Sequence, residues 1–178
     1  MRYLNILLLA AALVSVQGCA GLSSKTDLRS AGTQVEDDTI EKKSMEQIKA
    51  KYKDSAHVAV TSFNRSVLIT GETLGEESKT DVERIIRGIP NVKKTTNEIT
   101  VGALSTSGMR RTDSNITSEI KSHINKSKAI KVTVRVVTDR GVVYLLGLLP
   151  HAEANAAAEI ASTAANVKKV VRGFEYID

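Results

Sequence analysis

The stretch Val67-Leu68-Ile69-Thr70-Gly71 recurs later in the chain as Val143-Tyr144-Leu145-Leu146-Gly147, and this repeat decides the fold. Every position of the second stretch lies 76 residues after its counterpart in the first. Asp37 and Asp113 are separated by the same interval, so the register extends far upstream of the quoted stretches. A constant interval of this kind indicates a duplicated module.

The repeat continues toward the C-terminus after one deletion. Asn91-Val92-Lys93-Lys94 returns as Asn166-Val167-Lys168-Lys169, at an interval of 75 residues. We therefore predict two tandem modules, over residues 37–101 and 113–178. The segment between them, residues 102–112, is rich in Gly, Ser and Thr, and this composition predicts a flexible linker.

Each copy has the same order of periodic patterns: a helix, two strands, a second helix and a closing strand. In the second copy, Ile116, Ile120 and Ile124 recur at the spacing of one helical face, and Asp113 or Ser114 can cap the N-terminus of that helix. This order predicts an α+β fold with two tandem αββαβ modules. Each module should have two helices on one face of a three-stranded mixed sheet, with the closing strand parallel to a hairpin strand.

The two hairpins are predicted to turn at Asn64-Arg65 and at Asp139-Arg140-Gly141. Gly71 and Gly147 each follow an apolar strand, where a positive φ or a close approach of backbone favours glycine, so we expect both to be structural residues. The remaining predicted elements are second helices over Glu76–Gly88 and Ala152–Ala165 and closing strands over Thr95–Val101 and Val170–Ile177.

The N-terminus carries the only cysteine of the chain. An apolar run over Ile6–Val16 is too short to span a bilayer and has the length of a secretory signal. Val16-Gln17-Gly18-Cys19 is similar to the bacterial lipobox, with Gln17 as a departure from it. This similarity implies that residues 1–18 are a lipoprotein signal peptide and that Cys19 carries a diacylglyceryl group and an N-acyl lipid. Residues 19–36 would then form a flexible tether.

An ordinary secretory signal with a chance cysteine is the alternative. Cys19 has no second cysteine with which to form a disulfide inside the chain. Ala20 stands where an aspartate would favour retention in the inner membrane. By analogy with this sorting rule, the protein is expected at the periplasmic face of the outer membrane.

Two tandem modules with glycine-ending apolar strands and repeated Asn-Val-Lys-Lys segments resemble the BON domain family. Together with the lipobox, the pattern is similar to that of dual BON-domain outer-membrane lipoproteins. The resemblance implies a lipid-anchored periplasmic protein that supports envelope integrity. It also implies that the first helix of the second module, here Ser114–Lys128, binds anionic phospholipid, and that this directs the protein to the division site.

The residues of this helix give some independent support for contact with an anionic surface. Glu119 is its only acid. No aromatic residue lies near its end, so Ile130 is the nearest apolar candidate for insertion into the bilayer. The alternative interpretation of this charge pattern is a helix face that is simply exposed to solvent. The predicted lipid-binding residues are Thr117, Lys121, Asn125, Lys126, Lys128 and Ile130.

No catalytic or metal-binding motif is found in the sequence. His57, His123 and His151 have no ligand spacing, so we predict no metal, no cofactor other than the lipid on Cys19, and no enzymatic activity. Aromatic residues make up 3% of the chain, too few for base-stacking surfaces, which argues against nucleic-acid binding. The alternative function is a protein-interaction adaptor for envelope-assembly or cell-wall machinery, which would use exposed sheet edges or the Ala-rich second helix of the second module.

Overall fold

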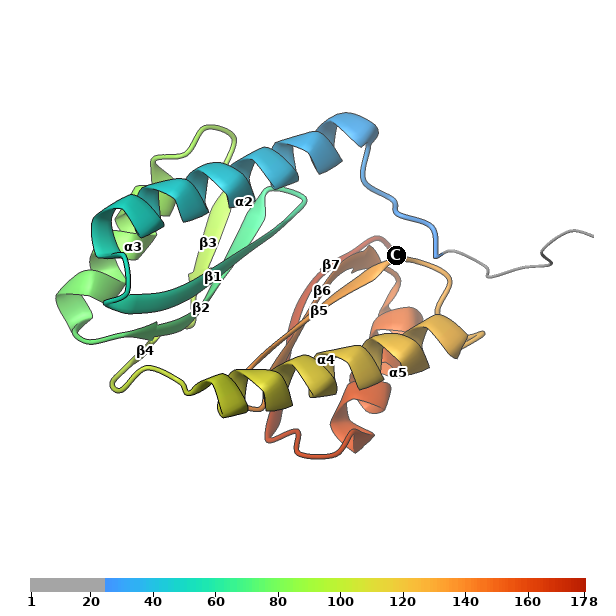
Figure 1. Ribbon diagram of the computed structural model, residues 1–178. Coiled ribbons are helices and arrows are strands. Elements are labelled where there is room, and N and C mark those ends of the chain that lie inside the picture. The colour runs from blue at the N-terminus through green and yellow to red at the C-terminus, as the bar shows by residue number, and fades with distance from the viewer. Residues whose placement is uncertain (1–24) are drawn as a thin grey trace, which may run out of the picture.

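The computed structural model describes residues 25–178; the predicted signal peptide and Cys19 lie outside the described residues. The first module contains α2 (Ala31–Tyr52), β1 (Ala56–Phe63), β2 (Ser66–Thr73), α3 (Glu76–Arg87), β3 (Lys94–Asn97) and β4 (Thr100–Val101). The second contains α4 (Ser107–Lys126), β5 (Val134–Asp139), β6 (Val142–Leu149), α5 (His151–Thr163) and β7 (Lys169–Tyr176) (Figure 1). The predicted α+β fold of two αββαβ modules is therefore confirmed.

The sheets have the predicted topology. In each module the first two strands form an antiparallel hairpin, and the closing strand pairs in parallel with the second hairpin strand. In the first module the closing strand is divided into β3 and β4, which both pair with β2. Between them, the backbone N–H of Ile99 donates to the side-chain oxygen of Asn97 at 3.2 Å.

Both hairpins turn at the predicted positions with two residues of positive φ. The φ angles are 52° and 66° at Asn64 and Arg65, and 51° and 79° at Arg140 and Gly141. Such turns match the right-handed twist of the flanking strands, but three of these four residues are not glycine and adopt the conformation at a cost. Their backbone N–H groups therefore need acceptors to stabilise the turns.

The repeated aspartates supply these acceptors from the helices. Asp37 accepts the N–H groups of Asn64 and Arg65 at 2.8 and 2.7 Å. Asp113 accepts those of Arg140 and Gly141, both at 2.9 Å. Each aspartate is buried inside its helix, so the prediction that Asp113 or Ser114 caps the helix is wrong.

Both first helices begin earlier than their apolar periods suggest. α4 begins at Ser107, and Thr106 caps it by accepting the N–H of Met109 at 3.2 Å. The C-terminal half of the predicted flexible linker is therefore helical. α2 begins at Ala31, capped by Ser30, so the end of the predicted flexible tether is helical too. Apart from Met109, which is 43% exposed, the extra turns carry no apolar residue at the core spacing, so the periodicity did not reveal them.

Each core lies between the helices and one sheet face. In the second module the Ile116, Ile120 and Ile124 stripe is buried against the sheet, as predicted. In the first module Ile40 and Ile48 of α2 have the same role. The alanines of α5 at positions 154, 157, 158 and 161 are also buried, so these alanines are not offered to a partner, and the adaptor hypothesis keeps the exposed sheet edges as its other contact surface.

The opposite faces of the two sheets pack against each other. Phe63 and Leu68 of the first module form one buried cluster with Tyr144 and Leu146 of the second. The helices consequently lie on the outside of the molecule, with α2 on one side and α4 on the other (Figure 1). Small modules bury little apolar surface alone, and this contact gives each module a second buried face.

The two structural glycines differ in their environment. Gly71 has a φ of 113°, and a Cβ built there would lie 1.9 Å from the carbonyl oxygen of His57. Gly147 has no left-handed φ, and its Cβ would meet a side-chain atom of Leu149 at 3.0 Å. We had expected each glycine to end its strand. Instead, β2 and β6 each continue for two residues beyond the glycine.

Candidate functional site

The predicted site has two parts, a lipid-attachment residue and a lipid-binding helix. Cys19 lies outside the described residues, so its role stays a prediction. The helix is α4, whose isoleucine stripe packs on the sheet and leaves the rest of its circumference for contacts outside the core. Among the described helices, none combines the length and apolar character needed to cross a membrane.

α4 does not present the predicted lipid-binding residues on one face. Successive helical residues are rotated by about 100°, so Lys126 lies about 140° around the axis from Lys121. The structure divides the set accordingly. Thr117 and Lys121 line a groove between the modules, whereas Asn125, Lys126 and Lys128 are exposed near the end of the helix.

Ile130, the candidate for insertion into the bilayer, is a core residue. Its side chain is 1% exposed and packs in the cluster that contains Ile120 and Ile124. The chain after α4 turns back and buries this side chain under the helix end, so the prediction of a lipid contact there is wrong. The apolar character of Ile130 was correctly recognised, but a sequence pattern could not show the direction of the loop.

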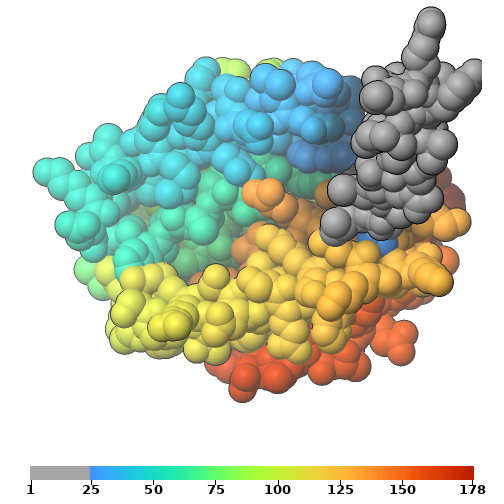
Figure 2. Space-filling model, turned by 45° about the vertical axis from the view of Figure 1, so that its right-hand side comes forward, coloured from blue at the N-terminus to red at the C-terminus, as the bar shows by residue number. Residues whose placement is uncertain are grey.

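The groove runs between the first module and α4, and Figure 2 shows it as a furrow below the blue and teal surface. It encloses about 490 Å³ and is lined by β1 and β2 on one side and by α4 and β5 on the other. Thr117 donates a 2.8 Å hydrogen bond to Thr138, and both residues lie on the second-module side of the groove. Because the opposite side belongs to the first module, the groove is part of the inter-module boundary and not an open helix face.

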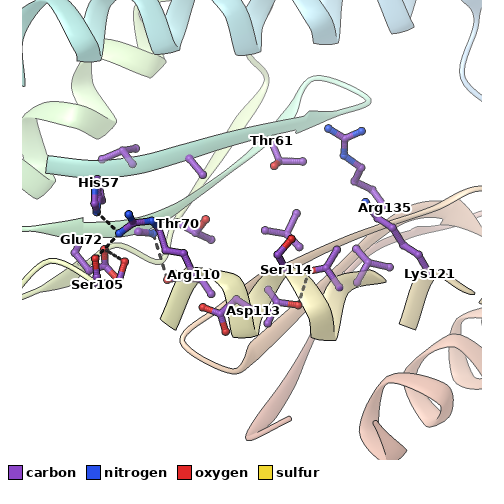
Figure 3. Close-up of a pocket in the computed structure, with 18 residues that line it drawn as sticks. His57, Thr61, Thr70, Glu72, Ser105, Arg110, Asp113, Ser114, Lys121 and Arg135 are labelled. Atoms are coloured by element: carbon purple, nitrogen blue, oxygen red, sulfur yellow. Dashed lines mark hydrogen bonds between the residues drawn. The ribbon is translucent and has the colours of Figure 1, made fainter. Parts of the chain in front are cut away.

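Basic side chains occupy both ends of this groove (Figure 3). At one end, Arg110 of α4 lies 3.2 Å from the ring nitrogen Nδ1 of His57 and donates to the carbonyl oxygen of Ser105. At the other end, Lys121 lies near Arg135 of β5. Partial burial and the Arg135 guanidinium lower the pKa of Lys121 below its ordinary value.

An ion pair joins the modules beside the groove. Arg140 donates to Glu72 at 2.8 Å, and Glu72 is 1% exposed. Burial by itself raises the pKa of Glu72, but the hydrogen bonds from Arg140 and Ser105 outweigh it and leave this pKa below its usual value. The nearby Asp139 has its pKa raised, first by burial and then by the negative charge of Glu72. Through its ion pair with Arg140, Glu72 helps to hold the modules together.

The end of α4 carries the most open positive surface of the predicted site. Lys126, Lys128 and Lys131 are all exposed within six consecutive residues, and we call them the lysine cluster. The nearby carboxylate of Glu153 accepts the backbone N–H groups of Lys131 and Val132, at 2.8 and 3.2 Å. An anionic surface could approach this end of the molecule without displacing core residues.

The three histidines occupy unrelated places. His57 lies in the groove, His123 is exposed on α4, and His151 stacks on Tyr176 with ring centroids 3.8 Å apart and contacts Asp178. Within residues 25–178, no group of three His, Cys, Asp or Glu side chains could hold a metal ion.

Sequence reasoning missed the basic residues that come from outside α4. Arg135 occupies an outward position of β5, and Arg110 lies in the helical turns that were assigned to the linker. A lysine upstream of α2, Lys25, also contacts the end of α4. Only the alternation of β5 could have pointed to one of them, because Arg135 lies between inward-facing valines.

Comparisons with known proteins agree with this architecture. The chain is 32% identical over 186 residues to the protein named outer membrane lipoprotein DolP of Haemophilus influenzae, covering 98% of this chain and 96% of that protein. It is 34% identical over 154 residues to a 21 kDa hemolysin of Actinobacillus pleuropneumoniae, covering 85% of this chain and 79% of the relative.

Solved structures add little. One match is the C-terminal domain of CdsD, a structural protein of the type III secretion system of Chlamydia trachomatis. The matched region includes 75% of this chain and 97% of the CdsD domain, with 10% sequence identity and a TM-score of 0.33. A likeness at this level carries no argument. The BON domain profile, by contrast, matches residues 36–103 and 112–178, almost all of the described chain. The chain therefore belongs to the BON domain family and contains two copies of the domain.

Proposed function

We propose that this chain is an outer-membrane lipoprotein, anchored by lipid on Cys19 at the periplasmic face, whose second BON domain binds anionic phospholipid. Its role would be to support the integrity of the outer membrane, with the division site as its place of action. The proposal is supported by the two BON domains, by the lipobox-like sequence before Cys19, and by the name of the Haemophilus relative, an outer membrane lipoprotein.

The observation that carries the lipid-binding part is the lysine cluster at the end of α4. Its three ammonium groups project from a short, exposed segment. Each lysine close to an anionic bilayer contributes about 1 kcal/mol, so three of them would strengthen binding by about a hundredfold at low salt.

The burial of Ile130 shapes the expected mode of binding. Without an apolar side chain to insert at this position, contact depends on electrostatic attraction to lipid head groups. Such attraction weakens within a Debye length of about 8 Å at physiological salt. We therefore expect binding that falls steeply as salt is raised.

Reversing two charges of the cluster should weaken binding. Lys126→Glu combined with Lys128→Glu replaces two attractions with two repulsions, so we expect a loss of about 2–4 kcal/mol in binding to phosphatidylglycerol vesicles at low ionic strength. Both side chains are exposed, so the fold should be retained, as circular dichroism would check. Sedimentation with vesicles measures the binding.

The matched control reverses Lys42 and Lys49 on α2. These lysines are also exposed, but α2 carries Glu41 and Glu46 beside them, so we expect a smaller effect. Lys121→Glu is a third variant for comparison, because Lys121 lines the groove and does not lie at the open end of α4. If the Lys126 and Lys128 reversal leaves sedimentation unaltered, or the α2 reversal is equally damaging, the adaptor function becomes the leading hypothesis.

Removing the proposed lipid should change where the chain is found in the cell. Cys19→Ser removes the thiol to which the diacylglyceryl group would be attached, so we expect a chain without acyl mass that appears in the soluble periplasmic fraction. Fractionation and mass spectrometry of the N-terminus measure the outcome, with Ser23→Ala as the control. A chain that stays in the membrane fraction without acyl mass would contradict the anchoring proposal.

A further inference from the structure

The segment from Lys25 to Ser30, which we call the strap, connects both modules before α2 begins. On the second module, the Lys25 ammonium donates to the carbonyl oxygens of Ser127, at 2.6 Å, and of Ile130. Thr26 forms a parallel bridge with Val132. Its N–H donates to the Lys131 carbonyl, and its own carbonyl accepts from Thr133, both at 2.9 Å. The strap is therefore held at the end of α4.

On the first module, the strap is held by Arg29. This side chain donates to the buried carboxylate of Asp37 at 2.7 Å, and its guanidinium lies 4.1 Å from the centre of the Phe63 ring. It also binds Asp27 within the strap, and that hydrogen bond is the main reason why the pKa of Asp27 is lowered. In Figure 1 the blue chain before α2 accordingly runs from the first module toward the loop after α4.

The Lys25 contact meets a specific need of the helix end. The last carbonyl groups of a helix have no partner within the helix, and they carry the negative end of its dipole. The Lys25 ammonium donates to the carbonyl of the C-cap residue Ser127 and to that of Ile130 in the following loop, so it ties the helix end to this loop. Exposed lysines of the cluster flank the same loop, but they do not make this contact, so Lys25 has a distinct structural role.

The chain length upstream gives the strap a consequence for membrane geometry. Only five residues lie between Cys19 and Lys25, so the two are at most about 20 Å apart even when this stretch is fully extended. α2, with 22 residues, is about 33 Å long, so its far end at Lys49 and Lys53 lies well away from the strap. A lipid on Cys19 would therefore keep the strap end of the molecule nearest the bilayer.

We propose that the strap fixes the anchored N-terminus beside the lysine cluster, so that the cluster meets the same bilayer that holds the lipid. Resting on the proposed lipid anchor, this inference assigns the partner surface to anionic phospholipid head groups in the anchoring membrane. A strap docked on the second module raises the local concentration of head groups at the cluster, as a short, well-matched linker does for a second binding event.

The test measures which lysines the membrane covers. The lipidated full-length chain is reconstituted in vesicles of phosphatidylethanolamine and phosphatidylglycerol, and lysine acetylation is followed by mass spectrometry. Compared with the soluble Cys19→Ser chain, Lys126, Lys128 and Lys131 should react severalfold more slowly. Lys49 and Lys53, which are exposed at the far end of α2, should react equally in both forms.

Two variants then separate the strap from the anchor. Lys25→Ala with Thr26→Pro removes the ammonium and the N–H that hold the strap to the second module. A flexible Gly/Ser insertion of about 20 residues before Lys25 keeps the strap docked but adds a reach of about 25 Å. Both should restore acetylation of the lysine cluster while acyl mass and vesicle association stay unchanged. Leu28→Ala is the matched control, because this strap residue is 42% exposed. Circular dichroism checks the fold of each variant.

The outcomes are distinguishable. A wild-type chain without acyl mass or vesicle association would overturn the anchor and the strap proposal together. An anchored wild-type chain whose lysine cluster reacts as fast as Lys49 and Lys53 would overturn the strap proposal alone. Continued protection of the cluster in both variants would do the same, because the lysines would then find the membrane without the strap.

Discussion

Replacing Asp37 with alanine is expected to lower the free energy of unfolding by about 3–5 kcal/mol, because it removes the acceptor of four hydrogen bonds from a buried site. The carboxylate is 1% exposed. It accepts the N–H groups of Asn64 and Arg65 in the positive-φ turn, the hydroxyl of Ser62 at 2.6 Å and the guanidinium of Arg29 at 2.7 Å. Without it, these donors lose their partner and the turn loses the group that offsets its backbone strain.

Two comparisons isolate this role. Asp38→Ala changes the exposed neighbour of Asp37 on the same helix and should cost about 0.5 kcal/mol or less. Asp113→Ala removes the equivalent acceptor of the second module, which serves two backbone N–H groups. Its loss in free energy of unfolding should lie between those of the other two variants. Urea denaturation of the soluble Cys19→Ser chain measures all three. Equal losses for Asp37→Ala and Asp38→Ala would show that the turn does not depend on the helix aspartate.

The sequence revealed that Asp37 and Asp113 are equivalent, but not what they do. The constant interval aligned them, and both the α+β fold and the strand order followed from the same repeat. An aspartate just before an apolar helical period is typical of an N-cap, so we assigned it there. The structure shows that the helices begin six residues earlier and that the aspartates reach across to the hairpins. In the six helical residues before each aspartate, Met109 alone continues the apolar stripe, which is too little pattern from which to predict a helix.

The candidate site was predicted less well than the fold, because it depends on how the modules pack. A helical wheel correctly placed Ile116, Ile120 and Ile124 in the core. It could not show that Thr117 and Lys121 line a groove whose other side is formed by the first module. The periodicity of one module carries no information about which face its neighbour will cover.

The strap was also beyond sequence reasoning. Lys25 bonds to residues 102 and 105 positions later in the chain, and nothing in the polar segment before α2 marks such a partner. Its composition is typical of a flexible tether, and we predicted one. Its order comes from bonds that form only when both modules are in place.

A methyl group at Gly71 is expected to destabilise the first module by about 3–5 kcal/mol, the sum of left-handed backbone strain and overpacking. The backbone here has a φ of 113°, which L side chains rarely adopt. The new Cβ would lie 1.9 Å from the His57 carbonyl oxygen, a backbone atom of the paired strand that cannot rotate away. Gly71→Ala should therefore force β1 and β2 apart at the point where they are antiparallel partners.

Gly147→Ala is the natural control, because it makes the same change at the repeat-equivalent position of the second module. Its Cβ would meet a side-chain atom of Leu149 at 3.0 Å and the Thr133 carbonyl at 3.3 Å, with no left-handed φ to maintain. A leucine methyl can shift by a rotamer change, so we expect a loss of about 1–2 kcal/mol. Thermal denaturation of the soluble chain would compare the two. Equal losses at both sites would mean that the repeat demands glycine for a reason common to both strands. A larger loss at Gly71 is expected because only there do a positive φ and a backbone oxygen act together.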